Sequence, residues 1–490
     1  MLVALLITPL FVAAAMAVLR RRRMLEVIYL AGALAILGMG GVVSLRVWRM
    51  GSLTVSTPMA LHALAGILRV DALSALMILV VTLLGAIAAI YSIGYLRAES
   101  TDGSDSRTNS FFALFHLFLF TMLLAVTTDN LGVMWVAIEG TTLATVFLVN
   151  LHNTRTSLEA AYKYLIVSSV GIALAFIGTV LMFYAGTSRT GAIGSNWTSL
   201  RAMASQLDPS LVRLAFAFIL VGYGTKAGLS PMHTWLPDAH SEAPAPISAL
   251  MSGVLLNVGL YALIRFKVVA DLAIGPGFSS RCLLGLGLLS LAVAAVFLLS
   301  QRNYKRILAY SSVEHMGIIC LGLGFGGTWG TVGALLHVLN HAFSKSMLFI
   351  LSGNIYLKYQ TTDTRRVRGL LRTLPVTGIA FLLGTLALVG LPPFGLFISE
   401  FLIFRAGVDA GMMPIVAIGI SLLVVVFAGM MASVNSMLYG PIPESMERGD
   451  PLAWSLAPLA INGGLLLLLG LVLPVAVMRV LEQIIKVFGV

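Results

Sequence analysis

Long apolar segments alternate with short polar connections along the whole chain. Each apolar segment holds about 20 residues, the length that an α-helix needs to cross the hydrocarbon core of a bilayer. The pattern predicts fourteen such segments, near 2–19, 24–43, 70–96, 110–127, 129–150, 160–185, 211–235, 244–264, 282–300, 303–323, 329–357, 375–404, 412–439 and 454–478. It therefore predicts an all-α protein that crosses the membrane many times, with residues 1–490 forming a single transmembrane domain.

Composition agrees with a membrane protein. Hydrophobic residues make up 59% of the 490 residues and charged residues only 10%, whereas soluble domains carry about 25% charged residues. The first apolar segment is followed, not preceded, by the basic run at 20–23. A secretory signal peptide carries its charges before the apolar stretch, so we interpret this segment as a helix of the mature protein.

The net charge of +11 does not predict a nucleic-acid partner. In membrane proteins, Lys and Arg gather in the cytoplasmic loops and set the topology. More than half of the 31 Lys and Arg residues fall in alternate connections, at 20–23, 97–107, 155–163, 302–306, 358–372 and 448. We therefore expect these connections to be cytoplasmic and both termini to lie outside.

Motifs for cofactors and catalysis are absent from the sequence. There is no P-loop, no dinucleotide fingerprint and no CxxC pair, so we expect no cofactor in this chain. Cys282 and Cys320 lack metal-ligand spacing and are expected to pack in the core. His233, Asp238 and His240 imitate a metal cluster, but they lie where the chain leaves the membrane. We expect neither a metal site nor a catalytic residue there.

Ionisable residues recur inside the predicted spans, where a charge is costly and marks a functional site by default. They are Glu139, Lys226, Glu314, His315, His337, His341, Lys345 and Glu400. Three of them follow each other at steps of four, at 337, 341 and 345, so they share one face of a helix. Burial and neighbouring charges bring the pKa values of carboxylates and amines closer together. Such a series of groups predicts a proton relay.

Other polar residues in the spans have simpler interpretations. Glu314 is adjacent to His315 and close to an arginine, so a local pair explains it as well as a functional role does. His116 stands alone in an apolar segment, and we expect it to pack against its neighbours. Asp71 and Asp129 come at predicted helix starts, where a carboxylate caps the backbone N–H groups.

Glycine and proline interrupt two of the predicted spans beside their buried charges. Gly224, Gly228 and Pro231 surround the lysine of the seventh segment, and Pro392 and Pro393 precede the glutamate of the twelfth. Proline removes a backbone donor and disrupts the helix before it. Unwound backbone at membrane depth needs protein or water to satisfy it. We therefore predict that helices 7 and 12 are broken.

Paired interruptions in the two halves of a chain point to a transporter built from repeats. The helix with Glu139 comes two before the first break, and the helix with His315 comes two before the second. Five helices separate the counterparts, and this odd number inverts one half relative to the other. We predict two inverted five-helix repeats, about 110–265 (helices 4–8) and about 282–440 (helices 9–13).

Three stretches carry a resemblance to a known family. GTKAGLSPMHTWLPDAHSEAPAPISALMSGVLLNVGLY resembles the signature of the antiporter-like subunits of respiratory complex I, of Mrp-type cation/proton antiporters and of group 4 membrane-bound hydrogenases. QRNYKRILAYSSVEHMGI and LPPFGLFISEF match two further family stretches, so the resemblance covers roughly 70–480. SSVEHMGI and LLNVGLY are most similar to component F of hydrogenase-4, of the formate hydrogenlyase type. The resemblance implies fourteen transmembrane helices and two inverted repeats.

The resemblance also implies roles for individual residues. The family's proton relay matches Glu139, Lys226, His315, His337, His341, Lys345 and Glu400 of this chain. One position departs from the family, because many relatives place a lysine or histidine where this chain has Asn257. An asparagine side chain orients water but does not titrate. No long lateral helix is expected after the fourteenth span.

The function implied is that of a proton-translocating membrane subunit of a multi-subunit redox complex, similar to hydrogenase-4 or complex I. Electron transfer in partner subunits would drive the protons, and this chain itself holds no redox centre. Its partners would be other membrane subunits and a peripheral redox arm, in the inner (plasma) membrane of a bacterial or archaeal cell. The alternatives are an Mrp-type cation/proton antiporter subunit, with sodium as a coupled ion, and a scaffold with an idle channel.

Overall fold

The computed structural model describes residues 1–19, 21–54, 66–99, 105–190, 195–442, 446–451 and 453–488, with side chains except at 105–106 and 187–190. Residues 20 and 100–104, which belong to predicted basic connections, lie outside these ranges. The described part of the chain is helical apart from its connections and one antiparallel strand pair, β1 (Ser52–Thr54) and β2 (Arg69–Asp71). An all-α class is therefore confirmed.

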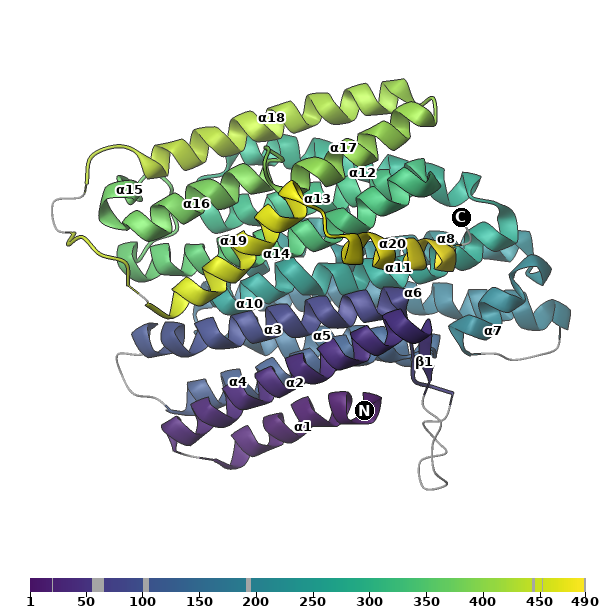
Figure 1. Cartoon of the computed structure of the whole chain (residues 1–490), viewed down its shortest axis with the longest axis horizontal. Coiled ribbons are helices and arrows are strands. Elements are labelled where there is room, and N and C mark those ends of the chain that lie inside the picture. Colours follow the sequence, from purple (N-terminus) through teal and green to yellow (C-terminus); the bar gives the residue numbers. More distant parts are fainter. Residues whose placement is uncertain are drawn as a thin grey trace.

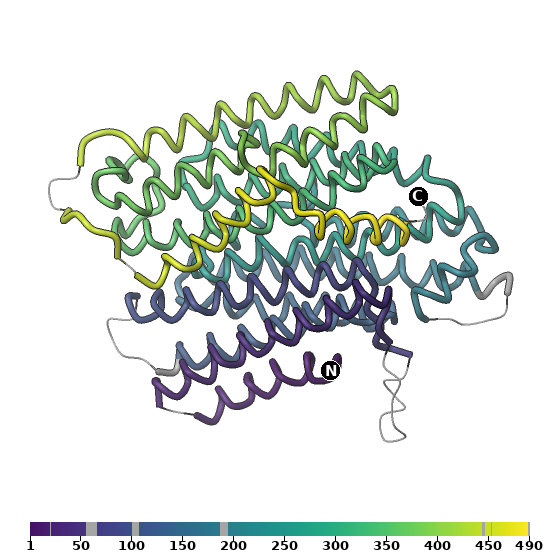
Figure 2. Tube along the Cα trace, in the orientation of Figure 1, coloured from purple at the N-terminus to yellow at the C-terminus, as the bar shows by residue number. Residues whose placement is uncertain are grey.

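The helices lie side by side in one elongated bundle (Figure 1). The first half of the chain forms α1 (Leu2–Val18), α2 (Arg22–Met50), α3 (Ala72–Glu99), α4 (Asp105–Thr127), α5 (Leu131–Val149), α6 (Arg155–Thr190), α7 (Trp197–Ala202), α8 (Pro209–Ala227), α9 (Trp235–Glu242), α10 (Ala245–Leu250) and α11 (Leu256–Ile274). The second half forms α12 (Gly277–Ser300), α13 (Tyr304–Phe325), α14 (Gly327–Tyr359), α15 (Leu370–Thr373), α16 (Pro375–Leu388), α17 (Gly395–Asp409), α18 (Met413–Leu438), α19 (Leu456–Leu471) and α20 (Val475–Phe488). Figure 2 shows the first helices at one edge of the bundle and α18 at the opposite edge.

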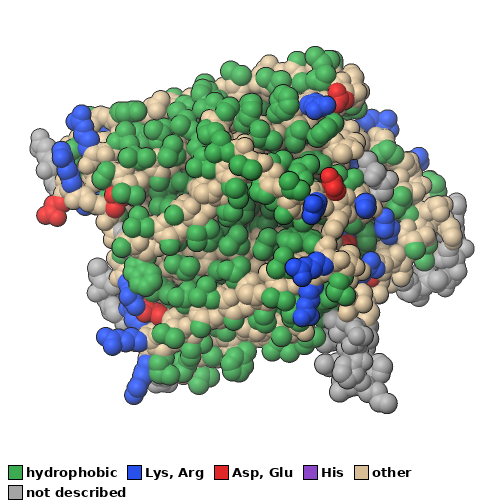
Figure 3. Space-filling view, in the orientation of Figure 1, with side chains coloured by type: hydrophobic (Ala, Val, Ile, Leu, Met, Phe, Trp, Pro, Cys, Tyr) green, Lys and Arg blue, Asp and Glu red, His purple; other side chains and the backbone are tan. Residues whose placement is uncertain are grey.

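Among the described residues, twelve helical stretches are long and apolar enough to cross a membrane, and two shorter apolar helices, Leu2–Val18 and Pro375–Leu388, accompany them. Hydrophobic side chains cover the middle of the face seen in Figure 3, whereas most of its Lys and Arg side chains lie towards the two ends. This band is what a bilayer requires of a protein that crosses it. The chain is a multi-pass membrane protein, and the side on which its termini lie stays a prediction.

Burial divides the helices into an inner and an outer set. The apolar windows of Ala245–Ile274 and Gly327–Tyr359 are wholly buried, whereas that of α18 is only 28% buried. The polar residues predicted at 257, 337, 341 and 345 therefore lie on helices that the rest of the bundle shields from lipid. Charged groups at membrane depth are found in such interiors because lipid offers them no partner.

Both predicted helix breaks are present. After α8, Gly228 adopts φ 78°, and the chain makes a short 3₁₀ turn before α9 begins. Only glycine adopts this left-handed conformation readily. Gly224 is itself helical, contrary to the prediction, because the α8 ladder continues to its cap at Gly228. The second break separates α16 from α17 and contains Pro392 and Pro393.

The last predicted span, 454–478, is wrong in its boundaries. Helix α19 ends at Leu471, and the separate helix α20 continues to Phe488. Pro474 follows a residue with φ 39°, and a proline ends a helix because it lacks the backbone N–H. Helix α20 packs on α3 and α14, and Gln483 donates a hydrogen bond to the carbonyl of Trp48 (3.0 Å).

The structure also shows the outcome of several predictions about single residues. Asp71 caps α3, accepting from the backbone N–H three residues later (3.0 Å). Asp129 does not cap its own helix, because the adjacent Asn130 does so and the Asp129 carboxylate accepts from Thr198 at the start of α7. His116 is fully buried and packs edge-on against Tyr29, as expected. Both cysteines are free, and Cys320 is buried. The two inverted repeats stay a prediction.

Candidate proton-relay site

Glu139 and Lys226, two members of the predicted relay, are connected through a hydroxyl group beside the first break. Thr142 of α5 accepts a hydrogen bond from Lys226 Nζ (2.8 Å) and donates one to Glu139 Oε2 (3.3 Å). Lys226 also donates to the hydroxyl of Tyr164 (3.0 Å), and Ser169 donates to Glu139 Oε1 (2.7 Å). Carboxylate and ammonium are thus joined in a hydrogen-bonded series rather than in direct contact.

Local structure explains why a lysine is tolerated there. Lys226 is fully buried in the last turn of α8, immediately before the unwound segment. An unpaired buried charge is costly, so such a group needs hydrogen-bond partners. The Tyr164 ring lies 5.2 Å from the lysine nitrogen and adds a cation–π contact. Thr145 in turn bonds the Tyr164 hydroxyl (2.7 Å), so the polar cluster extends along α5.

The second break carries a comparable series built on histidines. His315 Nδ1 and His337 Nε2 lie 2.9 Å apart, and His337 Nδ1 lies 2.9 Å from Ser399 Oγ. Glu400 is adjacent, because single ligand atoms of His315, His337 and Glu400 all lie within 4.8 Å of one another. The carboxylate fits against Gly390, where a side chain would collide with it. The two imidazoles bond each other, so a hydrogen-bonded series runs from His315 through His337 to Ser399.

Helix α14 presents its three predicted residues to the same interior. The His341 ring lies 5.3 Å from the His315 ring. Lys345 donates to the carbonyl of Leu308 (2.8 Å) and to Ser311. All three α14 residues are fully buried. Glu314 is buried on α13, and the Nδ1 atom of the adjacent His315 bonds His337.

Buried polar atoms without a hydrogen-bond partner lie around these clusters. Within the described ranges they include Asn257 Oδ1, both amide atoms of Asn340, and both ring nitrogens of His240 and His341. Buried polar groups in proteins are nearly always bonded, often to ordered water. The Asn257 amide nitrogen donates to Gly253 in the π-helical turn Met251–Leu255 (2.8 Å). Its oxygen accepts no hydrogen bond from the described residues.

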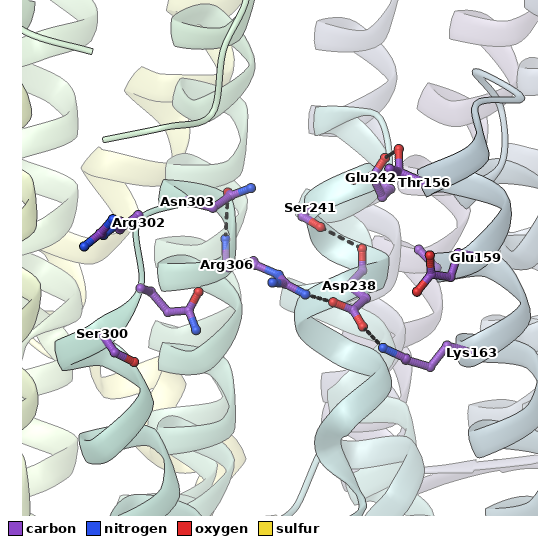
Figure 4. Close-up of a pocket in the computed structure, with 12 residues that line it drawn as sticks. Thr156, Glu159, Lys163, Asp238, Ser241, Glu242, Ser300, Arg302, Asn303 and Arg306 are labelled. Carbon is purple, nitrogen blue, oxygen red and sulfur yellow. Dashed lines mark hydrogen bonds and ion pairs between the residues drawn. The ribbon is translucent and has the colours of Figure 1, made fainter. Parts of the chain in front are cut away.

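Asp238 and His240, near the first break, have different neighbours. The Asp238 carboxylate accepts from Lys163 of α6 and Arg306 of α13 (Figure 4). His240 instead stacks on Phe349 at 5.0 Å, away from that ion pair. The Asp238 side of α9 borders a polar cavity of about 530 Å³, lined by Thr156, Glu159, Ala160, Lys163, Asp238, Ser241, Glu242, Ser300, Gln301, Arg302, Asn303 and Arg306.

The fold and the buried polar series define a class: a multi-pass membrane protein with ionisable groups beside two broken helices. The profile described as "NADH:quinone oxidoreductase/Mrp antiporter, TM" matches residues 128–426, and that of "NADH-Ubiquinone oxidoreductase (complex I), chain 5 N-terminus" matches residues 62–112. The first match covers more than half of the chain. The chain therefore belongs to this family of antiporter-like membrane subunits, as its motifs predicted.

Individual relatives agree with the profiles. The chain is 42% identical over 341 residues to a hydrogenase-4 component F homolog of Methylacidiphilum infernorum, which covers 69% of this chain and 72% of that protein. It is 33% identical over 425 residues to NADH-quinone oxidoreductase subunit N of Desulforudis audaxviator (84% and 81% covered). A chain of the membrane-bound sulfane sulfur reductase, an archaeal respiratory complex, superposes with a TM-score of 0.88 at 25% identity, covering 100% of this chain and 98% of that chain.

Proposed function

We propose that this chain is the proton-translocating membrane subunit of a multi-subunit redox complex. Electron transfer in partner subunits drives protons along the buried residues Glu139, Lys226, His315, His337, His341, Lys345 and Glu400. The observation that carries this proposal is the pair of hydrogen-bonded series, one beside each helix break. The relatives named as hydrogenase, quinone oxidoreductase and sulfane sulfur reductase components support assembly with redox partners.

In the first cluster the hydroxyl of Thr142 lets a proton pass between two charged groups. Lys226 gives a proton to Thr142 Oγ1 while the Thr142 hydrogen moves to Glu139, so the ammonium becomes an amine and the carboxylate a carboxylic acid. The hydroxyl is restored unchanged. A charge that approaches from a neighbouring subunit shifts this equilibrium, because Coulomb interactions are strong in a medium of low polarity.

The second cluster works by exchange between imidazoles. His315 and His337 share one hydrogen across their 2.9 Å contact. A proton that arrives on the free nitrogen of His315 displaces the shared hydrogen to His337 Nε2, and His337 gives its Nδ1 hydrogen to Ser399 Oγ, whose own hydrogen moves on to Glu400. Each histidine ends neutral, in the other tautomer. Rotation of the rings or a second transfer resets the series.

The middle of the path depends on water. Asn257 does not titrate, so protons cross there along solvent molecules held by Asn257 Oδ1 and by the ring nitrogens of His341, which have no partner within the described ranges. The polar cavity beside α9 offers a mouth at one end of the bundle, since its charged lining holds water at the membrane surface (Figure 4). This chain contributes no redox chemistry, and oxidation takes place in its partners.

The test uses the purified complex reconstituted in vesicles. Glu139→Gln and Lys226→Ala should each lower electron-driven proton uptake about tenfold or more, since a positioned proton-transfer group contributes about 10²–10⁴-fold. Subunit composition should be unchanged. Glu482→Gln, an exposed carboxylate on α20, is the matched control and should pump like wild type. Equal pumping by all variants contradicts the proposal. A sodium-dependent proton flux without any electron donor favours the Mrp-type antiporter instead.

A further inference from the structure

A second polar face runs along α11, beyond the residues used above. Asn257, Tyr261 and Arg265 follow each other at steps of four, so they share one face of the helix. All three are at most 5% exposed. This face leads from the middle of the bundle to the end that carries β1 and α7, on the right in Figure 1.

Hydrogen bonds continue from Tyr261 to the start of α3. The Tyr261 hydroxyl lies 3.0 Å from Ser74 Oγ, and Arg265 Nη2 donates to the same oxygen (2.9 Å). The Arg265 guanidinium also donates two hydrogen bonds of 2.6 Å to the Asp71 carboxylate. Residues nearly 200 positions apart in the chain thus form one polar connection between α11 and α3.

The end of this connection borders a small cavity. Its volume is about 10 Å³, roughly what one water molecule needs, and its lining includes Arg69, Thr128 and Asp129 besides the ion pair. Trp197 of α7 covers the guanidinium at 4.5 Å, and its ring nitrogen donates to the Arg265 carbonyl (2.8 Å). The short elements β2 and α7 cover the cluster here.

A purely structural role explains this arrangement incompletely. A buried ion pair gives little net stability, since desolvation offsets its attraction. A clamp between two helices requires Asp71 and Arg265 alone. The hydroxyls of Tyr261 and Ser74 and the water-sized cavity add groups that accept and donate hydrogen, and Tyr261 shares its helix face with Asn257.

We propose that this face of α11 is a proton-conducting branch that connects the centre of the relay at Asn257 with the membrane surface at Asp71. A proton on a water at Asn257 bonds to the Tyr261 oxygen, whose own hydrogen leaves to water in the cavity that Tyr261 lines. One proton enters, one leaves, and rotation restores the Tyr261 hydroxyl. The Asp71–Arg265 pair holds the branch closed at rest. This inference rests on the proposed function.

The test compares two buried tyrosines in the reconstituted complex. Tyr261→Phe removes one hydroxyl and keeps the ion pair, so electron-driven proton transport should fall about tenfold while subunit assembly stays intact. Tyr223→Phe is the control, because Tyr223 is equally buried, its ring stacks on Phe266 and its hydroxyl lies outside the hydrogen bonds that join α11 to α3. Its transport should equal that of wild type. Equal transport by both variants overturns the branch.

A second variant tests whether the Asp71–Arg265 pair closes the proton-conducting branch (a valve) or only holds α3 and α11 together (a clamp). Asp71→Asn keeps the shape of the side chain but removes its charge, which weakens the interaction with Arg265. Passive proton leak without an electron donor should therefore rise severalfold. Weaker assembly without a leak supports a clamp and contradicts the valve. If Asp71→Asn does not assemble, Tyr261→Phe decides alone. Glu139→Gln is measured in parallel: its loss of pumping beside a normal Tyr261→Phe refutes the branch only, whereas normal pumping in Glu139→Gln refutes the relay itself.

Discussion

Replacing Thr142 with valine tests the hydroxyl that joins Glu139 to Lys226. Valine has nearly the same shape and lacks the hydroxyl, so packing on α5 is retained. Lys226 Nζ then keeps its hydrogen bond to Tyr164 and loses the one to Thr142. A hydrogen bond to a charged group contributes about 1.5–3 kcal/mol, which corresponds to a factor of about 10 to 150 in an equilibrium. Proton transport should fall by a factor in that range.

The assay is dye-monitored acidification of vesicles that contain the complex, with the rate of electron transfer measured in the same sample. Thr141→Val is the control, because Thr141 is equally buried on the same helix and donates to the carbonyl of Ile138 instead of touching the pair. Thr142→Ser restores a hydroxyl and should recover most of the transport. Wild-type transport in Thr142→Val, or an equal loss in Thr141→Val, would refute the bridging role.

Three further predictions concern other parts of the molecule. His337→Leu should abolish proton transport while the subunits still co-purify, since the bond between the imidazoles is lost; pumping in the purified variant would contradict this. Gly390→Ala should lower the midpoint of thermal unfolding, because φ is 70° and a side chain meets the Glu400 carboxylate; such strain costs about 1–3 kcal/mol, and Gly38→Ala, in open space, should not share the loss. Burial alone raises the pKa of Asp71, but the Arg265 guanidinium outweighs it and lowers that pKa below its ordinary value. The stability that this pair contributes is therefore present above about pH 4 and lost as the pH falls further. The midpoint temperature of unfolding should therefore fall further in acid for the wild type than for Asp71→Asn.

The buried charged residues could be predicted from the sequence because a charged residue stands out in an apolar segment. Glu139 and Lys226 each stand in a long apolar segment, and glycine and proline beside Lys226 mark the break. Membrane chemistry makes such positions informative, since a charge there needs a reason. The spans themselves followed from segment length, and the boundaries of the last one failed although Pro474 was a visible signal.

The hydroxyl groups of the site could not be predicted from the sequence in the same way. Threonine and tyrosine are ordinary in membrane helices, so Thr142 and Tyr164 carry no signal of charge. The spacing of Thr142, three residues after Glu139, was a usable hint because such residues share a helix face. The contact between Asp71 and Arg265 joins distant parts of the chain, and a local pattern does not predict it. Adjacent Asp129 and Asn130 were equally good cap residues by type, and only the tertiary contact with α7 separates them.

The most direct test of the central proposal is proton movement driven by a chemical reductant. The purified complex is placed in sodium-free vesicles, reduced methyl viologen is added, and internal pH is followed together with electron transfer. We expect a pH change that begins with the reductant, collapses with a protonophore and is lost in Lys226→Ala. Electron transfer without any pH change in the wild-type complex, or an unchanged signal in Lys226→Ala, would contradict the assignment of this chain as the proton-translocating subunit.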